Sequence, residues 1–344
     1  MTESWIDVAF PVSCLPSQRD AGGRAKTGGR EPDGGTQRVD VFLARRLHPC
    51  SRAIVQRWIR EGRVLLRGSA AKASSRVQNG DSVVVRYPKR REPPPRHDAL
   101  SVLYEDDCML AVDKPGDLLS HPTGKVVRDT ATAIVARRFP GRRLHLAHRL
   151  DRETSGVLMF AKDPVSARLM QQQFDRREIL KEYLAAVWGR VGFASRIVDR
   201  PIAREGGEIR IRQAVADSSP KGQPAVTVFE RVRAGESLSV VRARPRTGRL
   251  HQVRVHLASL GHPVVGDKLY TGNGEYFLKA VFQRLTPDDL RQLGAPRQML
   301  HASRLTLRHP RSGRGLTLTA PPPDDFMRVL RAFGLKGRAS ILTR

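Results

Sequence analysis

The sequence contains few cysteines, few acidic residues and no long apolar run. Its three cysteines, Cys14, Cys50 and Cys108, lie far apart, which excludes a disulfide framework and a cysteine-based zinc site. No apolar run approaches the roughly 18 residues that a membrane-spanning helix needs. Residues 1–16 lack a basic leader ahead of their short apolar run, so we expect no signal peptide and a cytoplasmic location.

The sequence also lacks the motifs of enzymes that use nucleotides or cofactors. It has no Walker-type phosphate loop, no Gly-x-Gly-x-x-Gly and no Gly-x-Ser-x-Gly elbow, so we expect no cofactor. The best metal candidates are His145 with His148, and His251 with His256. Neither spacing brings a carboxylate in a known ligand pattern, so we expect no metal site.

Basic residues, in contrast, are abundant. The chain carries 61 Lys and Arg against 34 Asp and Glu, a net charge of +27. Such an excess creates a field that attracts polyanions, and nucleic acid is therefore the expected partner. The apolar fraction of 40% is enough to form a core, so the chain as a whole is not disordered.

Composition and periodicity divide the chain into five parts. A Gly- and Arg-rich leader at 1–37 has no periodicity and is expected to be loose. A small periodic segment follows at 38–87, and a linker at 88–99 holds three consecutive prolines that favour an extended chain. Mixed strand-like and helix-like patterns at 100–333 predict an α+β domain, and residues 334–344 form a short basic tail.

The small segment reads as helix, helix, strand, turn and strand. The first helix is indicated by apolar residues at helical spacing: Val39, Phe42, Leu43 and Leu47. The second begins at a Ser51 N-cap, ends at Gly62 and has a stripe of Ile54, Val55, Trp58 and Ile59. The strands are expected at 63–68 and 82–86, with a turn at Asn79-Gly80-Asp81.

This segment resembles the S4 RNA-binding domain. The resemblance rests on Arg38 to Ala44, on Ser51-Arg52 opening a helix, on Glu61 to Val64 and on Asn79-Gly80-Asp81. In that family a small αα-ββ module lays basic helices on structured RNA. The resemblance implies RNA contacts through Arg52, Arg57, Arg60 and Lys72, whereas charge runs in general are more often solvated helix faces.

Three polar segments of the large domain are candidates for chemistry. A charged loop at 148–156 enters the apolar strand 157–161, and composition alone also fits a surface loop whose Asp and Arg pair. The segment 181–189 alternates as a strand and carries Tyr183, either a core residue or a ring that stacks on a base. The third segment, 246–257, is rich in basic residues.

The third segment predicts a helix that follows a turn at Gly248 and ends before Gly261 and Pro263. Its apolar stripe is expected to be Leu250, Val253, Leu257 and Leu260. His251 and Arg254 are three residues apart and share a neighbouring face. A half-buried Arg254 needs an anion, either a phosphate or a carboxylate such as Asp151.

Together the three segments resemble the RluA family of RNA pseudouridine synthases. The signature loop is matched by His148 to Gly156, the Tyr motif by Lys181-Glu182-Tyr183, and the third motif by Thr247 to His256. A weaker match covers Tyr104 to Asp107 and Asp113-Lys114-Pro115, and the resemblance spans about 105–325. Gly116-Asp117 departs from the family's small residue and Gly, and 278–297 has no clear counterpart.

The resemblance implies isomerisation of uridine to pseudouridine in RNA on a mixed or antiparallel sheet with flanking helices. It implies that Asp151 is the essential carboxylate, that Arg254 pairs with it, that Tyr183 stacks on the uracil and that Arg149 occupies the vacated space. Further RNA contacts are expected at Arg249, His251 and Gln252. The S4 pairing favours large-subunit rRNA or a pre-ribosomal particle as substrate, and a monomer is the default.

Three alternatives remain at this stage. The target is either rRNA or tRNA. A non-catalytic RNA-binding or ribosome-assembly protein is a second class, although a pure binder gains nothing from a buried carboxylate facing RNA. A nuclease or glycosidase needs paired acids or a metal, and the candidate pair Asp151 and Glu153 points to opposite sides if the loop is extended.

Overall fold

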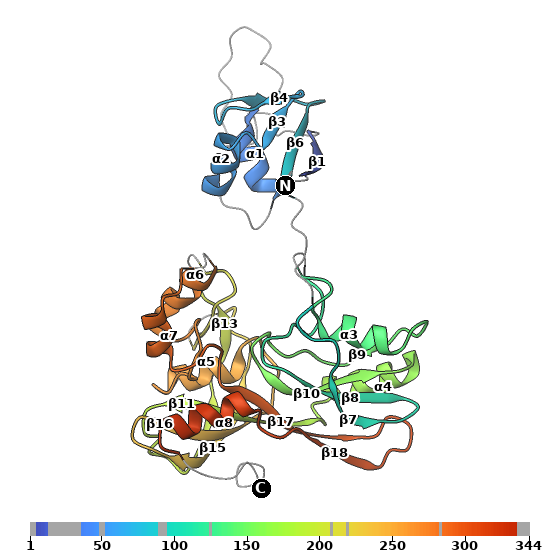
Figure 1. The fold of residues 1–344 in the computed structure, drawn as a ribbon, viewed down its shortest axis with the longest axis vertical. Helices are drawn as coiled ribbons and strands as arrows, with labels where there is room; N and C mark the ends of the chain where they lie inside the picture. The colour runs from blue at the N-terminus through green and yellow to red at the C-terminus, as the bar shows by residue number, and fades with distance from the viewer. Residues whose placement is uncertain are drawn as a thin grey trace. The chain divides into compact units, whose positions relative to one another are not determined.

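The computed structural model describes residues 5–12, 36–47, 52–88, 95–123, 126–206, 209–217, 220–281 and 284–335. The chain forms two compact units, Met1–Arg91 and Glu92–Arg344 (Figure 1). Among the described residues, no helix is both long enough and apolar enough to cross a membrane. The Arg/Gly-rich part of the leader, Ser51, Cys14, Cys50, most of the proline run and the tail from residue 336 lie outside the described ranges.

The N-terminal unit packs two helices against a small antiparallel sheet. The helices are α1 (Val39–Arg46) and α2 (Arg52–Arg60). The strands are β1 (Trp5–Pro11), β2 (Gln37–Arg38), β3 (Val64–Leu66), β4 (Ser69–Ala70), β5 (Arg76–Val77) and β6 (Ser82–Pro88). The main sheet has the order β1-β6-β3-β4, and β2 pairs with β5. The predicted helix, helix, strand, turn, strand order is therefore confirmed.

The apolar stripes of the two helices form the core of this unit. Val39, Phe42 and Leu43 of α1 are buried, whereas Leu47 just beyond it is only partly buried. In α2, Val55 and Ile59 are buried, and Ile54 and Trp58 of the predicted stripe are half-buried. Gly62 ends the helix with a φ of 68°, a conformation that costs glycine little.

The beginning of the chain differs from the sequence prediction. Residues 5–11 form β1, which pairs antiparallel with β6 along its whole length, from Trp5 opposite Pro88 to Pro11 opposite Ser82. The prediction of a loose leader is therefore wrong for this part of 1–37. Phe10 and Val12 pack on the core of the unit, and the free edge of β6 supplies the backbone partners.

The C-terminal unit is built on one mixed ten-stranded sheet. Eight strands follow the order β12-β15-β16-β11-β17-β10-β8-β7, with β18 on β17 and β9 on β10. The pairing of β10 with β17 is parallel, and the other pairings in this sheet are antiparallel. The strands are β7 (Ser101–Glu105), β8 (Met109–Lys114), β9 (His145–Leu146), β10 (Ser155–Ala161), β11 (Leu180–Trp188), β12 (Ser195–Asp199), β15 (Val226–Ala234), β16 (Leu238–Pro245), β17 (Leu300–Arg308) and β18 (Gly315–Thr319).

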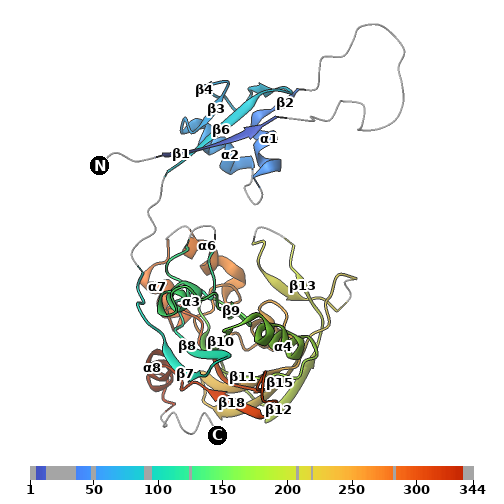
Figure 2. The same ribbon diagram turned by 90° about the vertical axis from the view of Figure 1, so that its right-hand side faces the viewer.

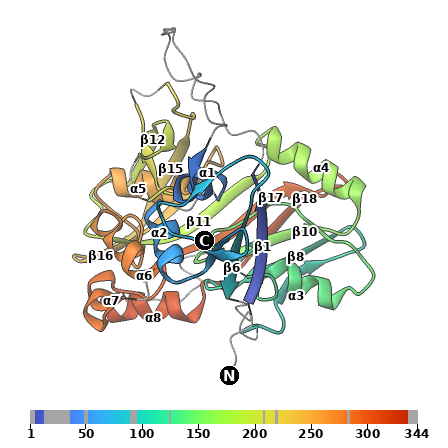
Figure 3. The same cartoon turned by 90° about the horizontal axis from the view of Figure 1, so that it is seen from above.

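Helices cover the two halves of this sheet unequally. Figures 1 and 3 show α3 (Ala131–Arg138) and α4 (Pro164–Asp175) beside β8 and β10. The same views show the others at the opposite half: α5 (Gln252–Ser259), α6 (Glu275–Val281), α7 (Pro287–Leu293) and α8 (Asp324–Ala332). A separate two-stranded ribbon, β13 (Ile202–Arg204) with β14 (Gln213–Val215), stands apart from the main sheet (Figure 2).

The centre of the sheet brings the three sequence motifs together. β10 follows the signature loop, β11 carries the Tyr motif, and β16 leads into α5 with the third motif. Because β17 pairs with both β10 and β11, and β11 pairs with β16, the motifs meet across adjacent strands. Gly156 has a φ of 110°, and a Cβ there would collide with the backbone of Ala302, so only glycine allows β10 and β17 to approach this closely.

Candidate active site

A pocket of about 600 Å³ lies where the three motifs converge, a size typical of a small-ligand site. Its lining includes all the residues singled out in this unit: Arg149, Asp151, Tyr183, Arg249, His251, Gln252 and Arg254. The first two come from the loop before β10 and Tyr183 from β11, whereas the other four belong to the segment that starts α5. The structure thus joins segments that are about 100 residues apart in the chain, as in the pair Arg254–Asp151 with a separation of 103.

An arginine with two carboxylate partners lies at the centre of this pocket. Arg254 Nη1 donates to Asp151 Oδ2 at 2.9 Å. Its Nε and Nη2 donate to the two oxygens of Asp267 at 2.7 and 2.8 Å. The Asp267 side chain is fully buried, whereas that of Asp151 is 26% exposed. The predicted anion for Arg254 is therefore Asp151, and Asp267 is a second partner that the sequence analysis did not assign.

The electrostatic surroundings keep Asp151 ionised. Burial works to raise the pKa of this carboxyl, but the charge of Arg254 and the hydrogen bonds of Arg254 and Gln298 outweigh it, so the pKa lies below its ordinary value. The loop also separates Asp151 from Glu153, because Glu153 accepts from Lys268 Nζ at 2.8 Å and from the Gln298 backbone at 3.1 Å. The two acids therefore do not form the paired carboxylates of a glycosidase.

Tyr183 lies on β11 beside this carboxylate. It is half-buried and packs against both large apolar clusters that adjoin the centre of the sheet. Burial first, and then the negative charge of Asp151, raise the pKa of its phenol above the ordinary value. Tyr183 is consequently a neutral phenol near neutral pH, with an apolar ring facing the pocket.

The backbone of the signature loop is anchored at one residue after another. Ser120 Oγ donates to the Leu150 carbonyl at 2.8 Å and accepts from the Leu150 amide at 3.0 Å. The other anchors are Lys114 Nζ on the Arg152 carbonyl (3.1 Å), Arg297 Nη1 on the Glu153 carbonyl (2.9 Å), Gln298 Nε2 on Thr154 Oγ1 (2.6 Å) and Ser155 Oγ with His301 Nδ1 (3.0 Å). These contacts hold the loop so that the Asp151 side chain keeps a defined position.

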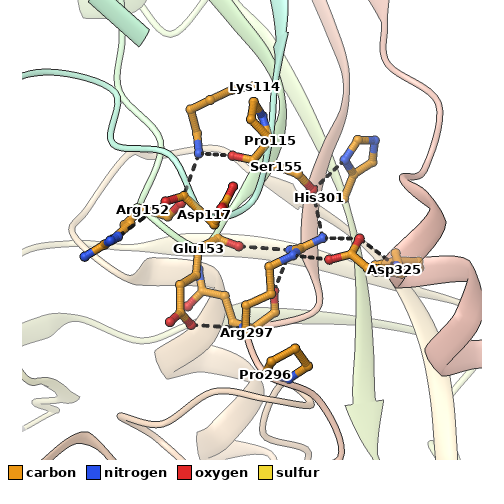
Figure 4. A network of polar contacts seen from close by, with 12 residues as sticks. Lys114, Pro115, Asp117, Arg152, Glu153, Ser155, Pro296, Arg297, His301 and Asp325 are labelled. Carbon is orange, nitrogen blue, oxygen red and sulfur yellow. Dashed lines mark hydrogen bonds and ion pairs between the residues drawn. The ribbon is translucent and has the colours of Figure 1, made fainter. Parts of the chain in front are cut away.

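Figure 4 shows the two cations that clamp this loop. Lys114 is fully buried, and its ammonium also donates to the carbonyls of Pro115 and Leu118 at 2.7 and 2.8 Å. Arg297 pairs with both oxygens of Asp325 at 2.5 and 2.8 Å. Burial lowers the pKa of Lys114 to about 7. Arg297 belongs to the segment 278–297 for which the sequence offered no counterpart, so its role was missed.

The departure at Gly116 has a steric explanation. A Cβ at this position would collide with the guanidinium of Arg297. The glycine of the turn after Lys114 and Pro115 therefore lies at the position where the Arg297 side chain passes close to the backbone. The sequence indicated only a turn here, because the partner is 181 residues further along the chain and lies outside the recognised motifs.

Basic side chains surround the mouth of the pocket. Arg149 is exposed, and Arg249 is half-buried with its Nε donating to the Pro224 carbonyl at 3.1 Å. Lys181 also lines the pocket, and burial lowers its pKa. It was missed as a site residue although it opens the Tyr motif. Lys181 lies two residues before Tyr183, and residues two apart on a strand point to the same face. This spacing is the signal that would have identified Lys181.

Two expectations for the third motif are corrected. Gln252 is buried, and its amide makes four hydrogen bonds within the protein, to Thr247 Oγ1, the Arg249 amide, the Val226 carbonyl and Thr227 Oγ1. These bonds occupy its two donors and two lone pairs, so it positions the loop instead of contacting RNA. Leu250 lies before α5 and is 46% exposed at the pocket, so it is not part of the buried stripe.

The basic residues expected to bind RNA in the N-terminal unit are all exposed: Arg52, Arg57, Arg60 and Lys72. Two of them also form ion pairs within the unit. Arg52 Nε pairs with Asp40 at 2.9 Å, and Arg57 Nε lies 3.7 Å from Glu61. Arg52 therefore has a structural role that the sequence analysis did not assign.

Two of the four histidines considered as metal ligands are engaged in hydrogen bonds within the protein. His256 is buried between Thr227 Oγ1 and the Arg200 carbonyl, and His148 Nε2 accepts from the Met159 amide. Within the described ranges, a different group has ligand spacing, Asp106, Cys108 and His309. His309 Nδ1 accepts from the Ser312 amide, so its Nε2 carries the hydrogen and donates to Asp106 at 2.6 Å. That hydrogen bond accounts for the cluster without a metal.

Comparison with known proteins supports the resemblance. The family model described as RNA pseudouridylate synthase matches residues 109–259, and the S4 domain model matches 37–83. The chain is 35% identical over 305 residues to "Ribosomal large subunit pseudouridine synthase D" of Xanthomonas campestris, which covers 86% of this chain and 88% of the relative. It is 30% identical to "Ribosomal large subunit pseudouridine synthase C" of Pasteurella multocida, covering 86% and 90%.

The fold agrees with solved structures. "Human RNA Pseudouridylate Synthase Domain Containing 4" matches with a TM-score of 0.55 and 27% identity, over 69% of this chain and 94% of that one. "Human RNA Pseudouridylate Synthase Domain Containing 1" matches with a TM-score of 0.52 and 29% identity, over 66% and 84%. The chain therefore belongs to the RluA-type family of RNA pseudouridine synthases, isomerases that here carry an N-terminal S4 RNA-binding domain.

Proposed function

We propose that the chain isomerises specific uridines of large-subunit ribosomal RNA to pseudouridine, with Asp151 as its catalytic carboxylate. The substrate is proposed from the printed names of the relatives, which act on the ribosomal large subunit, and from the S4 domain. A tRNA substrate is the second candidate. The single observation that carries the catalytic proposal is the partly exposed carboxylate of Asp151, held ionised by Arg254 in a pocket lined by Tyr183.

The reaction breaks the C1′–N1 bond, turns the uracil and joins C5 to C1′, with no net redox change. An ionised carboxylate beside C1′ supplies the nucleophile or base that this rearrangement needs. Arg254 acts as a positioning residue, because it fixes one oxygen of Asp151 and keeps its charge. Asp267 holds the other side of the guanidinium, so the arginine itself does not move.

Tyr183 and Arg149 are assigned to the base and to the space that it leaves. The uridine must leave its stack to reach the pocket, which costs a few kcal/mol. The ring of Tyr183 stacks on the uracil. We assign this role to Tyr183, and not removal of the C5 proton, because a neutral phenol is a poor base. Arg149 is exposed at the pocket mouth and occupies the vacated position in the RNA. Arg249 contributes a phosphate contact.

The S4 domain supplies a second RNA contact. We assign it to residues 38–87, extended by β1, with the linker at 88–99 and the catalytic domain at 100–333. Arg52, Arg57, Arg60 and Lys72 contact phosphates, and the tether raises the effective RNA concentration at the catalytic pocket. We further propose that the protein acts as a monomer in the cytoplasm.

The first experiment measures isomerisation at any uridine, so the target site need not be identified beforehand. Cellular RNA labelled with tritium at uracil C5 is separated into large-subunit rRNA, small-subunit rRNA and tRNA, and each fraction is incubated with purified protein. Release of tritium from large-subunit rRNA by the wild type, and none by Asp151→Asn, is the expected result. Asp288→Asn, an exposed acid on α7, serves as the matched control that keeps full activity.

The fractions separate the two parts of the proposal. Release from tRNA alone would replace the substrate and keep the catalytic assignment. Full activity of Asp151→Asn would overturn the catalytic assignment on any RNA. An RNA-binding measurement accompanies the assay: with six or more phosphate contacts, affinity falls by roughly 10³-fold or more between 50 and 200 mM salt.

A further inference from the structure

His251 has an unusual backbone conformation at the start of α5. It is the residue before the helix, and its φ of 57° and ψ of 15° place it in the left-handed region. Non-glycine residues adopt this region rarely, and such strain persists where the surrounding structure holds the residue for a purpose. Here the conformation turns the imidazole into the catalytic pocket, where its Nε2 lies 4.0 Å from Asp151 Oδ2.

Hydrogen bonding on the far side of the ring determines the tautomer of His251. The Tyr270 hydroxyl accepts from the Gln213 backbone amide at 3.1 Å and lies 3.1 Å from His251 Nδ1. Arg212 and Arg254 lie over the faces of the Tyr270 ring, and neither guanidinium accepts a hydrogen. We assign the phenol hydrogen to Nδ1, which places the ring hydrogen of His251 on Nε2, the atom that faces Asp151.

The imidazole also stays uncharged near neutral pH. The groups that face it are Arg254 on its own helix, Asp151 and Arg149 from the signature loop, and Asp267 and Tyr270 from the segment after α5. Burial first, and then the charge of Arg254, lower the pKa of His251 to about 4, although both acids oppose this shift. A neutral ring does not form an ion pair that would occupy the catalytic carboxylate.

We propose that His251 is a further catalytic residue, a neutral imidazole that donates its Nε2–H to O2 of the uracil as the C1′–N1 bond breaks. In every route the electron pair of this bond leaves with the uracil, and the negative charge spreads to its oxygens. O2 is the oxygen next to N1, and hence next to C1′ and Asp151. No proton is transferred: the hydrogen bond strengthens as charge develops, which is how a preorganised donor accelerates a reaction.

Tyr270 is then a positioning residue that acts through His251. Its hydroxyl keeps Nδ1 occupied, so the donor tautomer faces the uracil before the substrate arrives. This inference rests on the proposed role of Asp151 but not on which RNA is the substrate. The sequence led us to expect that His251 contacts RNA and increases affinity. In the present proposal His251 instead increases the rate of the reaction.

The test uses the full-length protein in excess over the labelled RNA, so that tritium release reports a single turnover. RNA affinity and thermal unfolding are measured alongside. His251→Asn tolerates the left-handed backbone but lacks the reach of the imidazole. We expect its rate to fall by about 10²-fold with unchanged RNA affinity and an unchanged unfolding temperature. His251→Gln carries an amide donor on a longer side chain and should recover part of the rate.

A double-mutant cycle distinguishes positioning from a general structural role. Tyr270→Phe keeps the ring that both arginines contact and removes only the hydroxyl, so the rate should fall by about fivefold to tenfold. In the His251→Asn background the same change should have no further effect, whereas independent effects would multiply. Multiplying effects would overturn the role of Tyr270.

Two outcomes would overturn the role of His251 itself. One is a wild-type single-turnover rate in His251→Asn. The other is a loss of RNA affinity with the single-turnover rate at saturating enzyme unchanged, which would make it an RNA contact only. Asp151→Asn, assayed in parallel, keeps the proposals separable. If Asp151→Asn is inactive and His251→Asn is active, only the role of His251 is rejected. If Asp151→Asn is active, the catalytic assignment of Asp151, on which the role of His251 rests, is rejected.

Discussion

Each of the two units contains an aspartate that is kept ionised by arginine, and the two aspartates differ in how much of the carboxylate remains accessible. Asp40 in α1 has no exposed side-chain surface and accepts four hydrogen bonds, from Arg38 Nε and Nη2, Arg52 Nε and Gln56 Nε2. Asp151 is 26% exposed and accepts one bond from Arg254. Both carboxyls have a pKa below the ordinary value against the cost of burial.

The difference separates a structural carboxylate from a reactive one. In the catalytic unit the structural function falls to Asp267, which is fully buried and accepts two bonds from Arg254 and two from the backbone amides of Leu269 and Tyr270. Asp267 thus resembles Asp40 in its surroundings. Because Asp267 satisfies most of the guanidinium, Asp151 takes only one bond from Arg254 and keeps an exposed surface for the substrate.

The largest expected effect comes from removing this division of roles. Asp267→Asn leaves a buried arginine with Asp151 as its one anionic partner, and breaking a buried pair costs about 3–5 kcal/mol of unfolding free energy. We also expect the single-turnover rate to fall by about 10²-fold, because Arg254 then draws Asp151 out of its position. Chemical unfolding and tritium release measure the two effects.

The exposed Asp288→Asn provides the control for Asp267→Asn. If Asp267→Asn lost stability yet kept the wild-type rate, the positions of Asp151 and Asp267 would be independent. The division of roles between the two acids would then be incorrect.

The next effect should be confined to the N-terminal unit. Asp40→Asn keeps the shape of the side chain but removes the charge that joins Arg38 and Arg52, so we expect a loss of about 1–3 kcal/mol. Both arginines are about half exposed and regain water, which limits the cost. The single-turnover rate at saturating enzyme should not change.

Limited proteolysis and thermal unfolding would reveal the Asp40→Asn effect, and Asp7→Asn at the exposed edge is its control. A large loss of the single-turnover rate at saturating enzyme would contradict the separation of the two carboxylates into structural and reactive kinds.

A smaller effect should follow from Gly116→Ala. The added methyl group meets the guanidinium of Arg297, and overpacking of this kind costs about 1–3 kcal/mol. We expect a modest fall in rate as well, because Arg297 holds the Glu153 carbonyl of the signature loop. Gly192→Ala is the matched control, since a Cβ there meets open space. Equal unfolding free energies for the two variants would reject the clamp.

The smallest effect concerns pH. A carboxyl whose pKa is lowered in the folded state stabilises the protein above its unfolded pKa of about 3.9, and this contribution is lost as pH falls through the lower folded value. Because the pKa of Asp40 is lowered, we expect the unfolding temperature of its unit to change little between pH 7 and 5 and to decline below about pH 4. Asp40→Asn should weaken this decline, and an unchanged profile would exclude Asp40 as its source.

Local patterns in the sequence predicted much of this molecule. The helical stripe of α1, the turn before β6 and the strand entered by the signature loop all depend on neighbours within a few residues. The prediction was wrong for β1. The only local signal there is a short alternation of residues, and the strand that pairs with β1, β6, lies some 77 residues further along the chain. It was wrong for Gln252 too, because polarity and spacing do not reveal that four protein groups already occupy its amide.

The sequence by itself determined the α+β class, the S4-like segment, the basic character of the chain and the three motifs that hold Asp151, Tyr183 and Arg254. Only the tertiary structure decided that Asp267 supports Arg254, that Lys114 and Arg297 clamp the signature loop, and that Tyr270 orients His251. Periodicity and turns are local properties of the backbone, so they can be read from neighbouring residues. Partners of buried charges depend on which strands and loops become neighbours across the sheet, and that is set only when the whole unit packs.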